Sequence, residues 1–212
     1  MGVVERRERE KQELREQISD AARTLFAQEG FEAVTMRKIA ESIEYSPTAI
    51  YLYFKDKEEL LREICVQDFR QLAHHFQSIA QIQDPVEKLR RTGLAYVDFG
   101  LTHPNHYRLM FMTPKPAAQH PDEVRLQKGN PEEDAYAFLR MIVLDCIAQG
   151  KFRAELTDAE SVSQILWAGV HGLVSLHIVM CKEEWVCFRP VRELAETLID
   201  TQLNGMLRQP RA

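Results

Sequence analysis

The sequence lacks the paired cysteines of a disulfide framework or a zinc site. Its four cysteines are scattered through 212 residues without a Cys-x-x-Cys pair: Cys65, Cys146, Cys181 and Cys187. At this density we expect reduced thiols, most of them in the core, although Cys181 and Cys187 could also form a redox pair. The first residues also lack the apolar segment of a secretory signal, so we expect a cytoplasmic protein.

A surplus of basic residues is missing as well. The formal net charge is -5, so a nucleic-acid partner has to be argued from local placement rather than from bulk charge. The motifs GxGxxG, GxSxG, HExxH and the Walker loop are absent, and we expect neither an enzyme nor a cofactor. His103 and His106 have a spacing that a metal pair could use, but His-Pro-Asn-His is more typical of a turn and helix start, so no metal site is expected.

No alternating strand pattern extends beyond a few residues. Apolar residues recur at helical spacing almost throughout, and glycine and proline divide the chain into about nine helices, which predicts an all-α fold. The proline-rich segment from Thr113 to Pro131 is expected to be mostly loop, with Pro131 opening the next helix. We expect a small N-terminal domain over residues 1–56 and a larger helical domain over residues 57–212.

One apolar run could in principle enter a membrane. It extends from Ile165 to Cys181 and reads ILWAGVHGLVSLHIVMC. The run is shorter than the ~20 residues that a membrane-spanning helix needs, and His171 and His177 interrupt it. We therefore expect a helix that is buried on two faces of a soluble protein.

The segment from Glu41 to Leu60, ESIEYSPTAIYLYFKDKEEL, places three tyrosines between two apolar helical patterns. Thr35 and Ser46 are expected N-caps, and Ser46 is followed by proline at the first helical position. Two short helices joined by a tight turn and packed on a longer first helix describe a helix-turn-helix. The apolar residues that its small core requires are Ile39, Ala40, Ile43, Ile50 and Phe54.

The side of the third helix that this core does not use is rich in hydroxyl groups. It carries Thr48, Tyr51 and Leu52, with Tyr45 and Ser46 at its entrance. Such a helix can lie in a major groove, where tyrosine hydroxyls reach phosphate oxygens without adding charge. Lys57, at the start of the next helix, is a further phosphate ligand. The alternative is a surface helix whose aromatic residues, Tyr53 above all, pack against a neighbouring domain.

The segment from Thr35 to Leu61, TMRKIAESIEYSPTAIYLYFKDKEELL, resembles the DNA-binding signature of the TetR family of bacterial transcriptional regulators. The positions that carry the resemblance are Thr35, Ile39, Ala40, Ser46, Ile50, Tyr51, Phe54, Lys57 and Leu60. The upstream AARTLFAQEGFEAVTM also fits, so the match covers about residues 11–62. Together with the surface described above, it implies these DNA-binding residues: Thr35, Arg37, Tyr45, Ser46, Pro47, Thr48, Tyr51, Leu52, Tyr53 and Lys57.

Two features differ from or flank this signature: Glu44 in the turn, and a group of basic residues before the first helix. The turn usually has glycine where this sequence has Glu44, and a left-handed backbone costs a non-glycine residue about 1 kcal/mol. We expect the turn to survive, because Glu44 faces solvent. The arm before the first helix contains basic residues that could contact the minor groove or phosphates, although the glutamates among them are equally typical of a solvated, frayed end. These residues are Arg6, Arg7, Arg9 and Lys11.

The larger domain of the resembling family binds a small effector and dimerises. The pattern Trp167-x-x-x-His171-Gly172 is similar to a recurrent C-terminal subtype of that family. The last two helices are apolar beyond the needs of one face, which predicts a homodimer with a four-helix interface, and Gly169 and Gly172 would permit close helix approach. The alternative is a monomer whose core uses both helices fully.

For the effector we expect a mostly apolar pocket where aromatic residues converge, with Tyr96, Tyr107 and His171 as polar anchors. The candidate residues are Tyr96, Phe99, Tyr107, Met110, Phe111, Phe138, Ile142, Trp167 and His171. Aromatic residues at helical spacing are also typical of a plain core. The sequence thus predicts a repressor that a small-molecule effector releases from a palindromic DNA operator. The alternative is a helical small-molecule-binding or enzymatic protein that has lost DNA binding.

Overall fold

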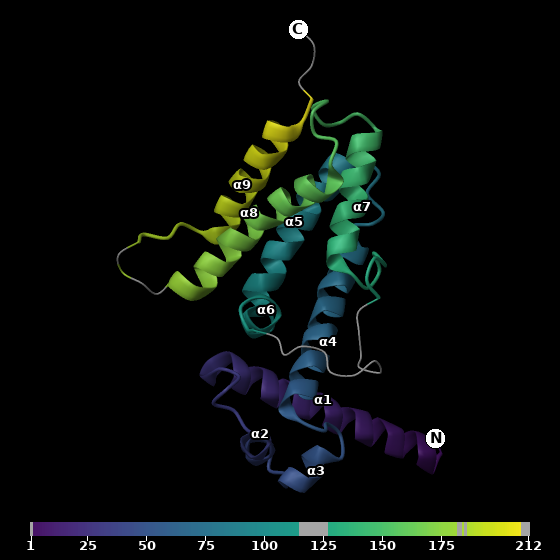
Figure 1. Cartoon of the computed structure of the whole chain (residues 1–212), viewed down its shortest axis with the longest axis vertical. Coiled ribbons are helices and arrows are strands. Elements are labelled where there is room, and N and C mark those ends of the chain that lie inside the picture. Colours follow the sequence, from purple (N-terminus) through teal and green to yellow (C-terminus); the bar gives the residue numbers. More distant parts are fainter. Residues whose placement is uncertain (1, 115–126, 182–183, 185, 209–212) are drawn as a thin grey trace. The chain divides into compact units, whose positions relative to one another are not determined.

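The computed structural model describes residues 2–114, 127–181, 184 and 186–208, which contain nine α-helices and no named strand (Figure 1). The predicted all-α fold is confirmed. The chain forms two compact units, the first from residues 1–68 and 105–125 and the second from residues 69–104 and 126–212. The border falls inside one helix, between Asp68 and Phe69, and the domain boundary predicted at residues 56 and 57 stays a prediction.

The helices follow the predicted order along the chain. The first four are α1 (Val3–Glu29), α2 (Met36–Ser42), α3 (Pro47–Tyr51) and α4 (Lys57–Gln77). The remaining five are α5 (Pro85–Thr102), α6 (Pro104–Phe111), α7 (Ala135–Ala148), α8 (Ala159–Met180) and α9 (Val191–Met206).

Polar side chains cap the helices largely where the sequence predicts them. The Thr35 hydroxyl accepts the Lys38 N–H at 3.2 Å, and the Ser46 hydroxyl accepts the Ala49 N–H at 3.2 Å. The prediction for Pro131 is wrong: α7 begins at Ala135, because the Asp134 carboxylate accepts the N–H groups of the two residues that follow Ala135. A charged acceptor at this position stabilises the helix start better than the proline does.

The turn between α2 and α3 has a left-handed residue at Glu44, with φ of 60°. The Glu44 N–H bonds to the carbonyl of Glu41 at 3.2 Å, and the Tyr45 N–H bonds to that of Ala40 at 2.9 Å. This is the double hydrogen-bond pattern of a Schellman motif, in which glycine is the usual left-handed residue. The helix-turn-helix therefore keeps its turn, with strain at Glu44.

The first unit buries one apolar core beneath α1, α2, α3 and the start of α4. Ile39, Ile50 and Phe54 are almost completely buried there, as the helix-turn-helix pattern requires. Leu109 of α6 is fully buried in the same core, and its carbonyl accepts a long hydrogen bond from the Cys65 thiol at 3.6 Å. The helix α6 thus contributes to the core of the first unit.

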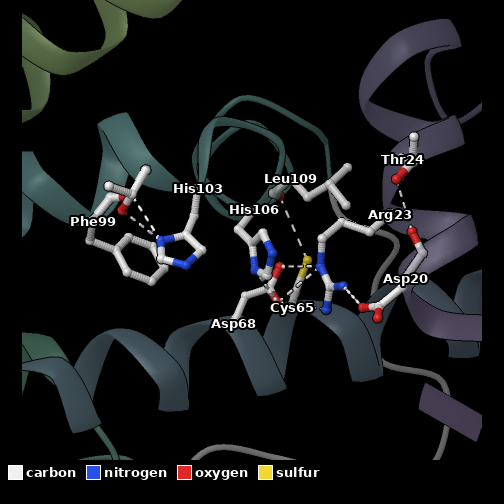
Figure 2. A network of polar contacts seen from close by, with 10 residues as sticks. Asp20, Arg23, Thr24, Cys65, Asp68, Phe99, His103, His106 and Leu109 are labelled. Atoms are coloured by element: carbon white, nitrogen blue, oxygen red, sulfur yellow. Dashed lines mark hydrogen bonds and ion pairs between the residues drawn. The ribbon is translucent and has the colours of Figure 1, made fainter. Parts of the chain in front are cut away.

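A buried ion pair adds a polar link between α1, α4 and α6 (Figure 2). The carboxylate of Asp68 is fully buried and accepts a hydrogen bond from Arg23 Nη2 at 2.9 Å. His106 Nδ1 lies 3.0 Å from the same carboxylate, which can only accept, so Nδ1 carries the proton. Arg23 also contacts the exposed Asp20. A buried carboxylate needs such partners, since burial without them is costly.

The second unit is built around α5, which packs against α7, α8 and α9. Figure 1 shows α8 and α9 side by side, and Gly169 of α8 lies where a Cβ atom would meet the Gln202 side chain of α9 at 2.5 Å. The buried positions of α8 form one stripe, Ala159, Val162, Ser163, Leu166, Val170 and Val174. The prediction that this helix is buried on two faces is wrong within the single chain, because the stripe with Ile165, Leu176 and Val179 is exposed.

Replacing Glu44 with glycine is expected to stabilise the protein. Relief of the left-handed backbone is worth about 1–2 kcal/mol, and the greater chain entropy of glycine offsets part of it, leaving roughly 0.5–1 kcal/mol. Urea denaturation monitored by circular dichroism measures the difference. As a control, Glu41→Gly inside α2 is expected to destabilise by about 1 kcal/mol. Equal effects at the two positions would contradict the assigned turn.

Asp68 and Asp20 both contact Arg23, which gives a matched pair of substitutions. Asp68→Asn leaves the buried guanidinium without its buried counter-charge and is expected to cost about 3 kcal/mol of unfolding free energy. Asp20→Asn removes a partner whose side chain is 76% exposed, so a loss below about 1 kcal/mol is expected. Chemical denaturation of both variants measures the contrast, and similar losses would refute it.

Candidate nucleic-acid interface

The helix α3 separates a buried side from an exposed side. Ile50 is fully buried, whereas Tyr51 is 54% exposed and Leu52 is 79% exposed. Thr48 is also exposed and lies on the same side, because residues three and four apart are neighbours on a helix. The chain therefore presents a hydroxyl group, a phenol and an apolar side chain together on a surface that the described residues of the unit leave open.

The entrance to α3 has further hydroxyl groups. Tyr45 is 43% exposed, and Pro47 is half-buried at the first helical position. The exposed hydroxyl group of Ser46 at this entrance, and that of Thr35 at the start of α2, accept hydrogen bonds as helix caps. A hydroxyl that accepts in this way still has its own proton to donate, so both groups can bond to a phosphate oxygen without giving up the cap.

Two predicted DNA-binding residues have roles inside the protein. Tyr53 is half-buried against the core, and its carbonyl accepts a hydrogen bond from Arg15 at 3.0 Å. The ammonium group of Lys57 donates to the carbonyls of Phe31 at 3.1 Å and Val34 at 3.4 Å, and it lies 4.3 Å above the Phe31 ring. Lys57 thus holds the loop before α2 in place, a role that follows from chain folding and has no local sequence signal.

One basic side chain near this surface, Arg37, is paired with a carboxylate. Arg37 is exposed and contacts Glu41 at 2.8 Å, and this hydrogen bond raises the pKa of the guanidinium. A phosphate that binds Arg37 has to compete with Glu41.

The arm expected before the first helix belongs to α1, which begins at Val3. Arg6 lies 2.7 Å from Glu10, and Arg9 lies 3.5 Å from Glu13. The described structure therefore has no extended basic arm for a minor groove, because i,i+4 pairs support the helix instead.

Three predicted effector residues come together in the second unit. Trp167 Nε1 donates to the Tyr96 hydroxyl at 3.1 Å, and that hydroxyl lies 3.1 Å from His171 Nδ1. Burial lowers the pKa of His171, which favours its neutral form. Phe99, Phe138 and Ile142 of the same unit are buried in its core.

The other three predicted effector residues, Tyr107, Met110 and Phe111, lie on α6 in the first unit, so the predicted set is divided between the units. The prediction also missed Tyr136, whose ring lies 5.8 Å from that of Trp167 and whose hydroxyl donates to Glu160 at 2.6 Å. The only local signal was an aromatic residue two positions before Phe138.

A cavity of about 440 Å³ in the second unit also escaped the sequence analysis. It is lined by the end of α4, by α5 and by α9, and the ion pair between Arg192 and Asp98, with a distance of 2.8 Å, lies at its wall. None of the predicted effector residues lines it. Its residues come from three distant segments, so no local pattern predicts it.

The two histidines considered as a metal pair have separate partners. His103 stacks on Phe99 with ring centroids 5.0 Å apart, and His106 contacts Asp68 as described above. Among the residues that the structure describes, no group of three or more potential ligands could hold a metal ion.

Comparison with known proteins relates both units to one family. Residues 18–64 match the family model described as "Bacterial regulatory proteins, tetR family", and residues 89–201 match "Tetracyclin repressor-like, C-terminal domain". The second match covers more than half of the chain. The Trp-x-x-x-His-Gly subtype stays a prediction.

Curated relatives are regulators. UidR of Escherichia coli K12 is 30% identical over 97 residues, which are 46% of this chain and 44% of UidR, so the chain spans less than half the length of that relative. TtgR of Pseudomonas putida is 26% identical over 87% of this chain and 93% of TtgR. KstR2 of Mycolicibacterium smegmatis, a transcriptional repressor, is 29% identical over 67% of this chain and 69% of KstR2.

Solved structures share the fold. A TetR family transcription regulator from Marinobacter aquaeolei has a TM-score of 0.72 at 21% identity, covering 96% of this chain and 100% of that one. The ketosteroid transcriptional regulator KstR2 of Mycobacterium tuberculosis has a TM-score of 0.64 at 16% identity, covering 92% and 95%. Taken with the two family models, these similarities lead to one conclusion: the chain belongs to the TetR family of bacterial transcriptional regulators.

Proposed function

We propose that the protein is a cytoplasmic homodimer that represses transcription by binding a palindromic DNA operator and is released by a small-molecule effector. The observation that carries the DNA-binding part is the division of α3, with Ile50 fully buried and Thr48, Tyr51 and Leu52 exposed. The name of the relative KstR2 as a repressor supports repression rather than activation.

DNA binding follows from the exposed side of α3. A short helix with hydroxyl groups and one apolar side chain fits a major groove, and two such helices in a dimer read the two halves of a palindrome. Tyr45, Tyr51, Ser46 and Thr35 supply hydroxyl donors for phosphates that flank the groove. Electrostatic attraction is modest, because Arg37 is paired with Glu41.

Dimerisation rests on the apolar surface of α8 and α9. Ile165, Leu176 and Val179 are each more than half exposed, and they share a stripe of α8 with Gly172, whose missing Cβ faces open space. Among the described helices, α8 is the one that is long and apolar enough to cross a membrane, and only 22% of its apolar window is buried. A twin subunit with the same stripe covers this surface in an isologous interface.

Effector release requires that the second unit influence the first. The helix α6 carries three predicted effector residues and also anchors Leu109 and His106 in the first unit. Only His103 separates α6 from the end of α5, on which Tyr96 lies. A ligand that binds one conformation of the protein more tightly than another shifts the population toward that conformation, and where this conformation binds DNA less well, DNA affinity falls by linkage.

The alternative function, a helical binding protein or enzyme without DNA binding, rested on Glu44 and the negative net charge. Glu44 occupies the left-handed position of an intact Schellman motif, so the turn is preserved. The alternative is therefore not favoured.

Tyr51→Ala is expected to lower affinity for the operator at least tenfold, because the hydroxyl and ring of an exposed contact residue are lost while the core is untouched. Titration of the purified dimer against DNA from beside its own gene, by gel shift or anisotropy, measures this. The control His74→Ala, at an exposed position of α4, is expected to bind normally. Unchanged affinity in Tyr51→Ala would count against DNA recognition by α3.

Val179→Asp is expected to convert the dimer to a monomer, since a charge buried in an apolar helical interface cannot be solvated there. Analytical ultracentrifugation measures the mass of the wild-type protein and of the variant. The matched control is Val4→Asp, in which an exposed apolar residue of α1 changes without effect on the dimer. A monomeric wild-type protein, or one that sediments with membranes, would refute the proposed interface.

A further inference from the structure

We infer that the operator is read mainly through the 5-methyl groups of thymines rather than through the hydrogen-bonding edges of guanines. This inference rests on the proposed DNA-binding function and specifies the class of sequence that it recognises. It concerns the exposed side of α3 and the turn before it, residues 45–52, which read YSPTAIYL.

Direct readout in the major groove uses a small set of side chains. Arginine and lysine recognise guanine, asparagine and glutamine recognise adenine, and carboxylates accept from cytosine. Residues 45–52 contain none of these six residue types. The side chains that make bidentate pairs with a base are therefore absent from this segment, and its only polar base contacts would be single hydroxyl bonds from Ser46, Thr48 and the tyrosines.

The remaining groups on this surface are hydroxyls and carbon. The Ser46 hydroxyl caps α3, and the phenols of Tyr45 and Tyr51 are long enough to reach the phosphate backbone. Apolar carbon remains for the base edges: the methyl group of Thr48 and the side chain of Leu52, which is 79% exposed. Thr48 lies in α3 and Leu52, four residues on, is its C-cap with helical backbone angles, so the two lie on the same side.

The only apolar group on a base edge in the major groove is the thymine methyl. An exposed leucine on the proposed DNA-binding surface is unfavourable in water and gains by burial against such a methyl group. Of the basic residues on either side, Arg37 is paired with Glu41 and Lys57 donates to backbone carbonyls. Exposed Lys55 follows the helix, where it can contact phosphates.

The inference is tested by removing single chemical groups from the bases of the DNA. A duplex selected from a random library by the full-length dimer is resynthesised with deoxyuridine in place of each thymidine in turn, and separately with 7-deazaguanine in place of each guanine. Loss of one contacted methyl is expected to weaken binding about fourfold, and loss of the symmetric pair about fifteenfold. Removal of the guanine N7 acceptor is expected to have less than a twofold effect.

Protein variants tested on the same duplexes show which residues contact the thymine methyl groups. In Leu52→Ala or Thr48→Ser, which remove carbon from exposed positions, the deoxyuridine penalty is expected to fall below twofold at one position of each half-site. The control Lys55→Ala is expected to weaken all duplexes equally, to keep the deoxyuridine penalty and to reduce the salt dependence of binding. Thermal unfolding of each variant verifies that the fold is intact.

The outcomes separate this inference from the proposed function. If no duplex is selected at low salt by the folded dimer, the proposed function fails. If a duplex binds but 7-deazaguanine weakens it tenfold and deoxyuridine does not, DNA binding stands and thymine readout is overturned. A deoxyuridine penalty that is identical in the wild type and in both α3 variants overturns the assignment to Thr48 and Leu52.

Discussion

The burial of Ile50 and Phe54 in the core of the first unit is the constraint on which the DNA-binding surface depends. A five-residue helix has little stability of its own, because helix nucleation costs more than a few hydrogen bonds return. The helix forms here because Ile50 packs into the core of the first unit, and because the Ser46 cap and Pro47 fix the helix start. Once Ile50 points inward, the geometry of the helix forces Thr48, Tyr51 and Leu52 outward.

Charge is used in this protein to fix structure more than to attract DNA. Arg23 and Asp68 form a buried pair, Arg15 contacts Glu63 while it lies 4.4 Å from the centre of the Phe54 ring, and Lys57 bonds to carbonyls. These contacts are within one unit and hold α1, α4 and the loop before α2 together. A surface that recognises DNA with few unpaired cations has to obtain its specificity from shape, hydroxyl groups and apolar carbon.

The apolar character of α8 has two explanations, one for each of two opposite sides of the helix. One stripe of the helix packs into the second unit, and Gly169 allows the Gln202 side chain of α9 to bond to the carbonyl of Ile165 at 3.0 Å. The opposite stripe, with Leu176 and Val179, is exposed in the single chain. A helix that is apolar all round thus serves one subunit core and, in the proposed dimer, one interface, which explains a hydropathy near that of a membrane span.

Local rules were sufficient for most of the helices and for the N-caps at Thr35 and Ser46, because each depends on residues within one or two turns of the chain, and the family resemblance indicated the left-handed turn at Glu44. The exposed side of α3 was also predictable, since the apolar spacing leaves only one side for the core. Tertiary structure alone decided the rest. It placed Lys57 on the carbonyls of Phe31 and Val34, put α6 in the first unit through His106 and Leu109, and formed the cavity beside Arg192 and Asp98. These features join residues that are 20 or more positions apart, and the free energy of such contacts depends on how whole helices pack, which no local pattern encodes.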